Sequence, residues 1–393
     1  MTKKTPASKR KLDSRVSERL CWFEERLDSL VQTITQLVEI ESPSHNKAAV
    51  DQLSALLAGR FEALGGHAKF HQVPDFGNHL QIDFSGRSGK PILLLGHLDT
   101  VYPLGTLAKM PCEINKGRLH GPGVLDMKSG VALAMQAIEA LRAWNEDELS
   151  RPVTVLLVSD EEIGSHSSRR ITESLAKKSA AVLVLEPSYG LHGAVKTARK
   201  GVGEYHIKVT GKAAHSGLDF EKGQSAILEL ARQIDRISKF IDLGRGLTLN
   251  VGLVKGGSAV NVVPAEASAV LDVRIAKMKD AAGIDKKLRS LKPFNRKCKI
   301  EVTGEINRPP MERTKGVAAL YEKAKIIARN LGWELEEAAV GGGSDGNFTA
   351  GLGIPTLDGL GGVGEGAHAV HESIVIAGLP RRAALLAGLI ETV

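Results

Sequence analysis

The strongest constraint on the fold is a short apolar run that ends in two polar residues. Residues 92–95 are apolar and lie between Pro91 and Gly96, which is typical of a strand buried on both faces of a sheet. His97 and Asp99 follow, and because side chains alternate along an extended chain, both point to the same side. Open α/β sheets bind their ligands at the carboxyl ends of such strands. A capped turn with a core histidine is the competing interpretation for this pair taken alone.

The chain around this strand alternates between helical and strand patterns. Apolar residues recur every three or four positions through residues 20–38 and 50–64, which predicts two helices. The further expected elements are strands 67–71 and 78–84, helix 128–144, strand 153–159, helix 166–178 and strand 181–185. This order predicts an α/β fold with a mixed, largely parallel sheet that is covered by helices.

The pattern changes in the middle of the chain. The expected order there is strand 203–210, helix 224–240, strands 247–254 and 266–275, helix 279–291 and strand 297–303. This is the β-α-β-β-α-β order of a ferredoxin-like α+β unit. The α/β pattern then resumes with helix 314–331, strand 333–338, a loop 341–347, strand 353–357 and a last helix from about residue 373. We therefore expect a basic disordered tail over 1–19, a first domain in two parts, 20–196 and 308–393, and an inserted domain over 197–307.

Composition limits the class of protein and its partners. The chain has 393 residues, 42% of them hydrophobic and 25% charged, which is ordinary for a soluble globular protein. No run approaches the apolar length that spans a bilayer, so no membrane partner is expected. The basic residues 1–11 lack the apolar core of a signal peptide behind them, and Cys21, Cys112 and Cys298 have no paired spacing. These features predict a cytoplasmic protein.

The net charge of +7 is concentrated at the N-terminus. Five cations precede the first acidic residue, Asp13, and they account for most of the excess. No interleaving of aromatic and basic residues and no nucleic-acid motif accompanies them. We interpret the tail as a solvated arm and expect no nucleic-acid partner.

Further polar side chains lie at other predicted strand and helix ends. Asp126 stands in a glycine-rich turn at the start of a helix, and strand 153–159 runs into the three carboxylates at 160–162. Strand 181–185 ends at Glu186, and His368 is the last candidate. Adjacent carboxylates in a shared cleft repel one another unless a cation binds them or their pKa values are raised. Two imidazoles and several carboxylates without thiolates suit zinc, manganese or cobalt, and they exceed the needs of one tetrahedral ion.

Taken together, the motifs carry a resemblance to a known family. They are His97-x-Asp99, Gly121-Pro122-Gly123-x-x-Asp126-x-Lys128-x-Gly130, Asp160-Glu161-Glu162-x-Gly164-Ser165, Glu186-Pro187 and Gly366-Ala367-His368-x-x-x-Glu372. From about Thr33 to the C-terminus, the chain resembles the dinuclear zinc peptidase and deacylase family. That family includes glutamate carboxypeptidase, acetylornithine deacetylase, succinyl-diaminopimelate desuccinylase and aminoacylase, and the glutamate carboxypeptidase-like branch is the nearest. The resemblance implies the zinc-exopeptidase type of fold with a ferredoxin-like dimerisation domain.

The resemblance also implies a set of metal ligands. Asp126 would bridge two Zn²⁺ ions per chain, with Co²⁺ or Mn²⁺ as substitutes, and the bond from Asp126 to Met127 would be cis. His97 and Glu162 would complete the coordination of one ion, and Glu186 and His368 would complete the coordination of the other. A rival to His368 is the nearby His371; His368 is preferred because Glu372 then follows by four residues, as in the family.

The resemblance further implies the catalytic roles. Asp99 would orient the ring of His97 by accepting a hydrogen bond from the ring nitrogen that does not bind the metal. Glu161, left free of metal, would act as the general base that takes a proton from a metal-bridging water and passes it to the leaving nitrogen. Independently of the family, amide hydrolysis near neutral pH needs a nucleophile stronger than water. A bound metal supplies one, because it can lower the pKa of water from about 15.7 to about 7.

The inserted domain and one loop carry the residues expected to contact substrate. His215 resembles the family histidine that reaches into the partner subunit's active site and stabilises the oxyanion, which implies a homodimer through the inserted domain. Asn261 and Arg274 resemble ligands of the substrate carboxylate, a task that suits the forked guanidinium. Gly343 belongs to a glycine-rich loop that lies beside the metals in the family.

These features predict a zinc-dependent metallopeptidase that releases a C-terminal amino acid from a small peptide. An N-acyl-amino-acid deacylase with the same site is the alternative, and a non-catalytic dimeric binding protein is a third hypothesis. Ala194 stands where glutamate carboxypeptidases have a lysine associated with the glutamate side chain. The preferred side chain is therefore left open.

Overall fold

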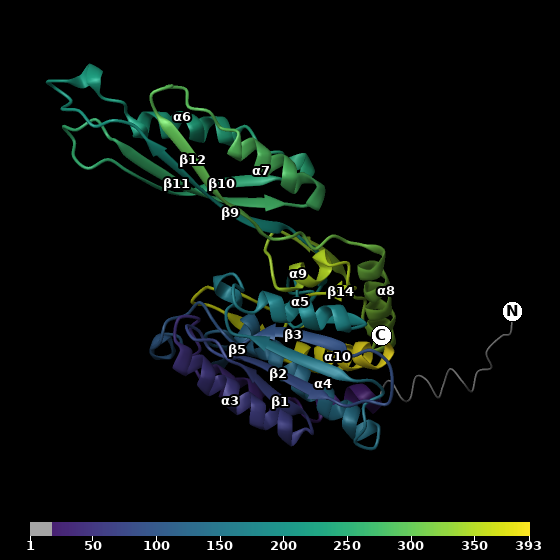
Figure 1. The fold of residues 1–393 in the computed structure, drawn as a ribbon. Helices are drawn as coiled ribbons and strands as arrows, with labels where there is room; N and C mark the ends of the chain where they lie inside the picture. The colour runs from purple at the N-terminus through teal and green to yellow at the C-terminus, as the bar shows by residue number, and fades with distance from the viewer. Residues whose placement is uncertain (1–17) are drawn as a thin grey trace. The chain divides into compact units, whose positions relative to one another are not determined.

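The computed structural model describes residues 18–393, which form two compact units (Figure 1). Within this part of the chain, the first unit contains residues 18–198, Arg313–Ala339 and Ser344–Val393, and the second contains Arg199–Glu312 and Val340–Gly343. The predicted domain boundaries stay predictions. Most of the predicted tail, residues 1–17, lies outside the described residues, whereas its last two residues are helical.

A six-stranded sheet organises the first unit, in the order β1-β2-β6-β3-β7-β14. The strands are β1 (His67–His71), β2 (His79–Phe84), β3 (Ile92–His97), β6 (Val153–Val158), β7 (Ala181–Val184) and β14 (Thr356–Leu357). The pairs β6–β3, β3–β7 and β7–β14 are parallel, and β1–β2 and β2–β6 are antiparallel. The predicted mixed, largely parallel sheet is confirmed.

Helices cover both faces of this sheet, as the apolar run at 92–95 predicts. Ile92 and Leu94 belong to the core on one face, and Leu93 and Leu95 to the core on the other, because neighbouring side chains alternate. The first face packs against α2 (Leu27–Val38), α3 (Lys47–Ala63), α4 (Ser129–Trp144), α8 (Lys315–Asn330) and α10 (Leu379–Thr392), and the second against α5 (Arg169–Lys178). Each fully buried leucine contributes about 1.5–3 kcal/mol, so β3 is firmly fixed.

A smaller sheet brings two distant loops together. Its order is β15-β16-β5-β4, with β4 (Glu113–Asn115), β5 (Arg118–His120), β15 (Gly364–Glu365) and β16 (Ser373–Val375). The pairing of Ser373 with His120 places the loop that contains His368 beside the turn that contains Asp126. The prediction of a helix from residue 373 is wrong, because residues 373–375 pair with β5 and α10 begins at Leu379.

Several other bounds differ from the predicted ones. The first predicted helix is interrupted near residue 25, and the strand predicted at 333–338 is β13 (Glu337–Val340), which pairs with the unpredicted β8 (Val195–Arg199). The predicted loop 341–347 ends in a short helix, α9 (Gly346–Gly351). Short helical turns are η1 (Thr106–Ala108), η2 (Val124–Lys128), η3 (Glu161–Ile163), η4 (Phe220–Lys222), η5 (Leu243–Arg245), η6 (Met278–Asp280) and η7 (Ile376–Gly378). None of the helices within residues 18–393 has the length and apolarity that a membrane crossing requires.

The second unit has the predicted ferredoxin-like order. It consists of β9 (Gly201–Thr210), α6 (Ala226–Ser238), β10 (Thr248–Gly256), β11 (Glu266–Ile275), α7 (Ala281–Arg289) and β12 (Lys299–Arg308). Its antiparallel sheet has the order β10-β11-β9-β12, so β10 and β12 are the edges. Alternate residues of β9, such as Tyr205 and Ile207, are buried in a core with Leu230 of α6 and Leu288 of α7.

One glycine controls how closely α4 approaches the strand end that carries Glu186. A Cβ at Gly130 would lie 2.0 Å from the carbonyl oxygen of Leu185, directly after β7. We expect Gly130→Ala to force the helix away and to lower the free energy of unfolding by about 1–3 kcal/mol, as measured by urea denaturation. Gly59→Ala, in α3 with open space around the new methyl group, is the matched control and should stabilise by about 0.5–1 kcal/mol. Equal stability of the Gly130→Ala and wild-type proteins would contradict this account.

Candidate active site

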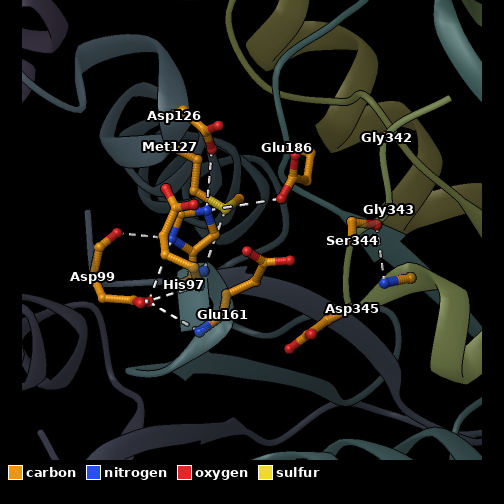
Figure 2. Close-up of polar contacts among 12 residues, drawn as sticks. His97, Asp99, Asp126, Met127, Glu161, Glu186, Gly342, Gly343, Ser344 and Asp345 are labelled. Carbon is orange, nitrogen blue, oxygen red and sulfur yellow. Dashed lines mark hydrogen bonds and ion pairs between the residues drawn. The ribbon is translucent and has the colours of Figure 1, made fainter. Parts of the chain in front are cut away.

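The five predicted metal ligands meet in the first unit, at the carboxyl ends of the parallel strands. His97 ends β3, Asp126 lies in η2, Glu162 lies in η3, Glu186 follows β7 and His368 precedes β16. The carboxylate of Asp126 lies between the two histidines: its Oδ1 is 3.1 Å from Nε2 of His97, and its Oδ2 is 3.3 Å from Nε2 of His368. One carboxylate therefore faces two imidazoles with its two different oxygens (Figure 2 labels Asp126 and His97).

The closest contacts divide the remaining carboxylates differently from the expected arrangement. Nε2 of His97 lies 3.7 Å from Oε1 of Glu186, and Nε2 of His368 lies 3.2 Å from Oε1 of Glu162. The expected arrangement placed Glu162 with His97 and Glu186 with His368. Residues 18–393 also contain the wider group His97, Asp126 and Glu162, whose ligand atoms lie within 4.8 Å of one another. The direct contacts nevertheless favour the exchanged pairing.

The electrostatics of this cluster are those of a cation site. Burial opposes the protonation of His97, but its hydrogen bond to Asp126 and the charges of Asp126, Asp99 and Glu162 outweigh burial and raise its pKa well above the usual value. Hydrogen bonds to Asp126 and Glu162 raise the pKa of His368 to about 10. Metals compete with protons for such ligands. The nitrogen and oxygen donors, without a thiolate among them, fit zinc, manganese or cobalt.

The tautomer of His97 is fixed by the backbone of Asp99. Nδ1 of His97 lies 2.9 Å from the carbonyl oxygen of Asp99 and 3.6 Å from its carboxylate. A carbonyl oxygen only accepts hydrogen bonds, so Nδ1 carries a proton, and Nε2 is the nitrogen that offers a lone pair to the cluster once the ring becomes neutral. The closer orienting partner is thus the main chain of Asp99, whereas its side chain had been expected.

The side chain of Asp99 instead fixes the turn that carries the two neighbouring glutamates. Its Oδ1 accepts the N–H of Glu161 at 3.2 Å, and its Oδ2 accepts the N–H of Glu162 at 3.1 Å and the hydroxyl of Ser44 at 2.7 Å. Burial raises the pKa of Asp99 to about 6. A carboxylate oxygen of Glu161 lies within 4.8 Å of ligand atoms of His97 and Glu186 (Figure 2). Ser44 was not identified from the sequence, because no local pattern separates it from an ordinary turn serine.

A buried carboxylate holds the turn that presents Asp126. Glu372 accepts three main-chain N–H groups, from Gly123 at 3.0 Å, Leu125 at 2.8 Å and Asp126 at 2.9 Å. The peptide bond from Asp126 to Met127 is cis, which confirms the prediction. Glu372 is completely buried, so this anchor is shielded from water. Both His368 and its rival His371 are exposed, but the ring of His368 is the one that contacts Asp126 at 3.3 Å and Glu162 at 3.2 Å.

The second unit contains all four residues that were predicted to contact substrate, namely His215, Asn261, Arg274 and Gly343. The main chain of His215 pairs with Val262, and the carbonyl oxygen of Asn261 accepts the N–H of Ser216 at 3.0 Å, so His215 and Asn261 lie on adjacent segments. Nδ1 of His215 accepts the N–H groups of Gly217 and Leu218, each at 3.1 Å. In the neutral ring, Nε2 therefore carries the hydrogen and is a donor.

Arg274 and the glycine-rich loop have partners that the sequence did not reveal. Two nitrogens on one edge of the Arg274 guanidinium, Nε and Nη2, donate to the two carboxylate oxygens of Asp272, each at 2.7 Å. The guanidinium of buried Arg199 donates to the carbonyl oxygens of Gly342 at 3.3 Å and Gly343 at 3.0 Å. Arg274 is thus oriented by a neighbour on its own strand, and Arg199 holds the loop that contains Gly343.

Comparison with known proteins identifies the family. The mixed sheet and the imidazole–carboxylate cluster place the chain among two-unit α/β hydrolases with a candidate metal centre. Residues 93–392 match peptidase family M20/M25/M40, and the chain belongs to this family. Carboxypeptidase G2 from Pseudomonas sp. (strain RS-16) is 29% identical over 368 residues, covering 92% of this chain and 88% of the relative. Acetylornithine deacetylase from Myxococcus xanthus is 28% identical over 268 residues, covering 63% and 67%. The predicted resemblance is confirmed.

Solved structures confirm the predicted fold. A tripeptidase from Staphylococcus aureus matches with a TM-score of 0.78 and 24% identity over 93% of this chain and 98% of that chain. A dinuclear metal-binding peptidase from Bacillus subtilis matches with a TM-score of 0.70 and 15% identity over the same shares.

The anchoring of the Asp126 turn by Glu372 generates a prediction. Glu372→Gln would place an amide N–H₂ group against main-chain N–H donors, so we expect the turn to loosen and metal affinity to fall about 10- to 100-fold. The measurement is competition with a chromophoric chelator. Glu365→Gln, at an exposed site on β15 where Glu365 pairs with Arg118, is the control and should bind metal as wild type does. Unchanged affinity in a folded Glu372→Gln protein would show that the turn needs no such anchor.

Proposed function

We propose that the protein is a two-metal hydrolase that cleaves the amide bond of a C-terminal amino acid in small peptides, as a carboxypeptidase-like metallopeptidase. The observation that carries this proposal is the placement of Asp126, whose two oxygens face two different histidines, each of which also contacts a second carboxylate. Two such half-sites around one bridging carboxylate are suited to a pair of metal ions.

In this proposal the half-sites divide the ligands by contact. His97 and Glu186 would hold one ion, His368 and Glu162 the other, and Asp126 would bridge both. Zinc is the proposed metal, with cobalt or manganese as substitutes. Bound there, the metals would polarise the amide carbonyl and make water a better nucleophile near neutral pH.

Glu161 is proposed to move the protons. It lies on the same short turn as Glu162, and the carboxylate of Asp99 holds the N–H groups of both residues. Glu161 would accept a proton from the attacking water and deliver it to the leaving nitrogen. Asp99 would act through its side chain on this turn and through its carbonyl oxygen on His97.

Residues of the second unit are proposed to bind the substrate. Asp272 occupies Nε and one hydrogen of Nη2 of Arg274, and Nη1 donates one hydrogen to the carbonyl oxygen of Gly341 at 3.5 Å. The second hydrogens of Nη1 and Nη2 would be available to a substrate carboxylate. Asn261 would add an amide donor, and Gly343 would let the loop main chain approach the substrate. His215 would donate from Nε2 to the oxyanion, which is the tautomer that its own loop favours.

A homodimer through the second unit is proposed because one of its sheet edges is apolar and unpaired. Edge strand β10 exposes Leu253 and Val254, with relative exposures of 60% and 58%, and α6 exposes Ile227 and Leu228. An exposed apolar edge favours association. A two-fold axis along β10 would pair this surface with its own copy, so His215 would serve the partner's site.

The side chain at position 194 bears on the choice of substrate. Ala194 is buried and apolar, so no charged group stands at this position to pair with a glutamate side chain. Deacylation of N-acyl amino acids is the second candidate function, favoured by similarity to acetylornithine deacetylase. Free cysteines agree with the proposed cytoplasmic location, and we continue to expect neither nucleic-acid nor membrane partners.

A substrate panel on zinc-loaded protein tests the proposed activity. We expect release of the C-terminal residue from dipeptides and tripeptides, measured as free amino acid, with slower turnover of N-acetyl and N-succinyl amino acids. Glu161→Ala should abolish turnover and keep two metals per chain, because Glu161 is proposed to move protons. Loss of metal from Glu161→Ala would mean that Glu161 is a ligand. Faster turnover of the N-acyl compounds would favour the deacylase.

Mixing two inactive variants tests the proposed dimer. His215→Ala and Glu161→Ala are each expected to be nearly inactive alone. In a mixed dimer, one site would combine an intact Glu161 with an intact His215 from the partner, so activity should return to about a quarter of wild type per total site after random exchange. No recovery, with subunit exchange demonstrated by mass spectrometry, would place the action of His215 within its own chain.

A further inference from the structure

A fully buried histidine lies behind the turn that carries Glu161 and Glu162. His79 begins β2, and because β2 runs antiparallel to β6, this end of β2 lies beside the end of β6 from which the turn leaves. The ring of His79 contacts Ser159 and Ser167, which flank the turn on its two sides. His79 belongs to none of the family motifs and to neither ligand group found within residues 18–393.

The hydrogen bonds of this histidine have a defined direction. The main-chain N–H of Ser159 donates to Nδ1 of His79 at 3.1 Å, so Nδ1 is an acceptor. In the neutral ring, Nε2 then carries the hydrogen and donates to the hydroxyl of Ser167 at 3.1 Å. That hydroxyl is left to donate its own hydrogen to Oδ2 of Asp160 at 2.7 Å. The result is a chain from Ser159 through His79 and Ser167 to Asp160.

The surroundings keep His79 neutral. Burial lowers its pKa, and the positive charge of Lys47 and the ring of His71 act in the same direction, against the opposing charges of Asp160 and Asp345. A neutral imidazole with one acceptor and one donor nitrogen matches these contacts, in which Nδ1 faces both the N–H and, at 3.0 Å, the hydroxyl of Ser159, and Nε2 faces the hydroxyl of Ser167.

This chain of hydrogen bonds ends at Asp160, which closes the turn that carries Glu161 and Glu162. The carbonyl oxygen of Asp160 accepts the N–H of Ser165 at 2.7 Å, which closes the turn around Glu161 and Glu162. Oδ2 of Asp160 also accepts the N–H groups of Ser167 and Ser168 at 2.7 and 3.4 Å. Its other oxygen, Oδ1, is buried and has no hydrogen-bond partner within residues 18–393. The carboxylate is therefore held through Oδ2, which accepts two hydrogen bonds from Ser167, one from its N–H and one from its hydroxyl.

We propose that His79 is a positioning residue for the hydrolytic reaction: through Ser167 and Asp160 it fixes the turn that aims Glu161 at the reacting atoms. This inference rests on the proposed function. Asp99 holds the N–H groups of Glu161 and Glu162, so the turn is restrained at its centre by Asp99 and at its flanks by the chain of hydrogen bonds through His79. His79 itself contacts neither metal nor substrate in this proposal, so it acts only on the placement of Glu161 and Glu162.

A double-mutant cycle tests whether His79 and Ser167 act in one linear chain of hydrogen bonds. We expect His79→Leu and Ser167→Ala each to lower kcat about 10- to 100-fold, with little change in KM, because substrate binding does not involve the turn. The double variant should lose no more than the worse single variant, since both changes break one chain. Losses that multiply in the double variant would overturn the proposal.

Conservative replacements and a matched control separate positioning from general destabilisation. His79→Gln can still donate near the position of Nε2 and should keep more activity than His79→Asn, which places its amide near Nδ1. His71 is the control, because it pairs with His79 between β1 and β2 and its ring contacts Gln81. His71→Leu should retain wild-type kcat. A kcat that follows the melting temperature across all these variants would reduce His79 to a structural residue.

Hydrogen exchange tests the inference independently of turnover. We expect His79→Leu to speed amide exchange of residues 159–168 about tenfold or more, while the same segment in His71→Leu stays protected. Unchanged exchange in His79→Leu would overturn the positioning role, even if the wild-type enzyme hydrolyses peptides. Faster exchange in a protein that hydrolyses no amide would instead retain the role for the turn and refute the proposed function.

Discussion

The main physical constraint on the site is the repulsion among carboxylates that the fold holds close together. Asp126 contacts both imidazoles, while Glu186 contacts His97 and Glu162 contacts His368, so three carboxylates gather around two rings. Without a metal, protons on His97 and His368 offset this charge, which is why their pKa values rise. A site that attracts protons this strongly also attracts metal cations, so the rest of the structure must hold the carboxylates in place against their repulsion.

The fold supplies that restraint through buried polar groups behind the segments that carry Asp126, Glu162 and Glu186. Glu372 holds the Asp126 turn, and Asp99 holds the turn of Glu161 and Glu162. Near Glu186, the buried guanidinium of Arg382 donates to the carbonyl oxygens of Gly193, Gly359 and Gly361, and the N–H of Gly361 in turn donates to the carbonyl oxygen of Glu186 at 2.8 Å. Most partners are main-chain groups, so loop positions are fixed even where the sequence is glycine-rich.

Local sequence patterns predict the strands, helices and candidate site residues, but not the hydrogen bonds that hold the loops of the site. The buried strand at 92–97, the ferredoxin-like order and the polar strand ends are visible because they rest on periodicity and short spacing. The contacts of Glu186 with His97 and of Glu162 with His368, the strand 373–375 and the hydrogen bonds of Glu372 cannot be predicted in this way. Each depends on contacts between segments far apart in the chain, such as Glu372 with Gly123 or Ser373 with His120. The partnership of Asp272 with Arg274 is local, but its geometry requires knowing which strand face both residues share.

The two units carry opposite kinds of polar groups. The first offers mainly acceptors, and these need cations before they can act on an amide. The second offers donors, because the loop around His215 engages Nδ1 and leaves Nε2 as the donor, while Asp272 orients the guanidinium of Arg274. Groups that are oriented before binding lose less conformational entropy when an anionic substrate arrives. A substrate with a carboxylate beside its amide bond would give these oriented donors a charged partner, whereas a neutral amide would leave them without one.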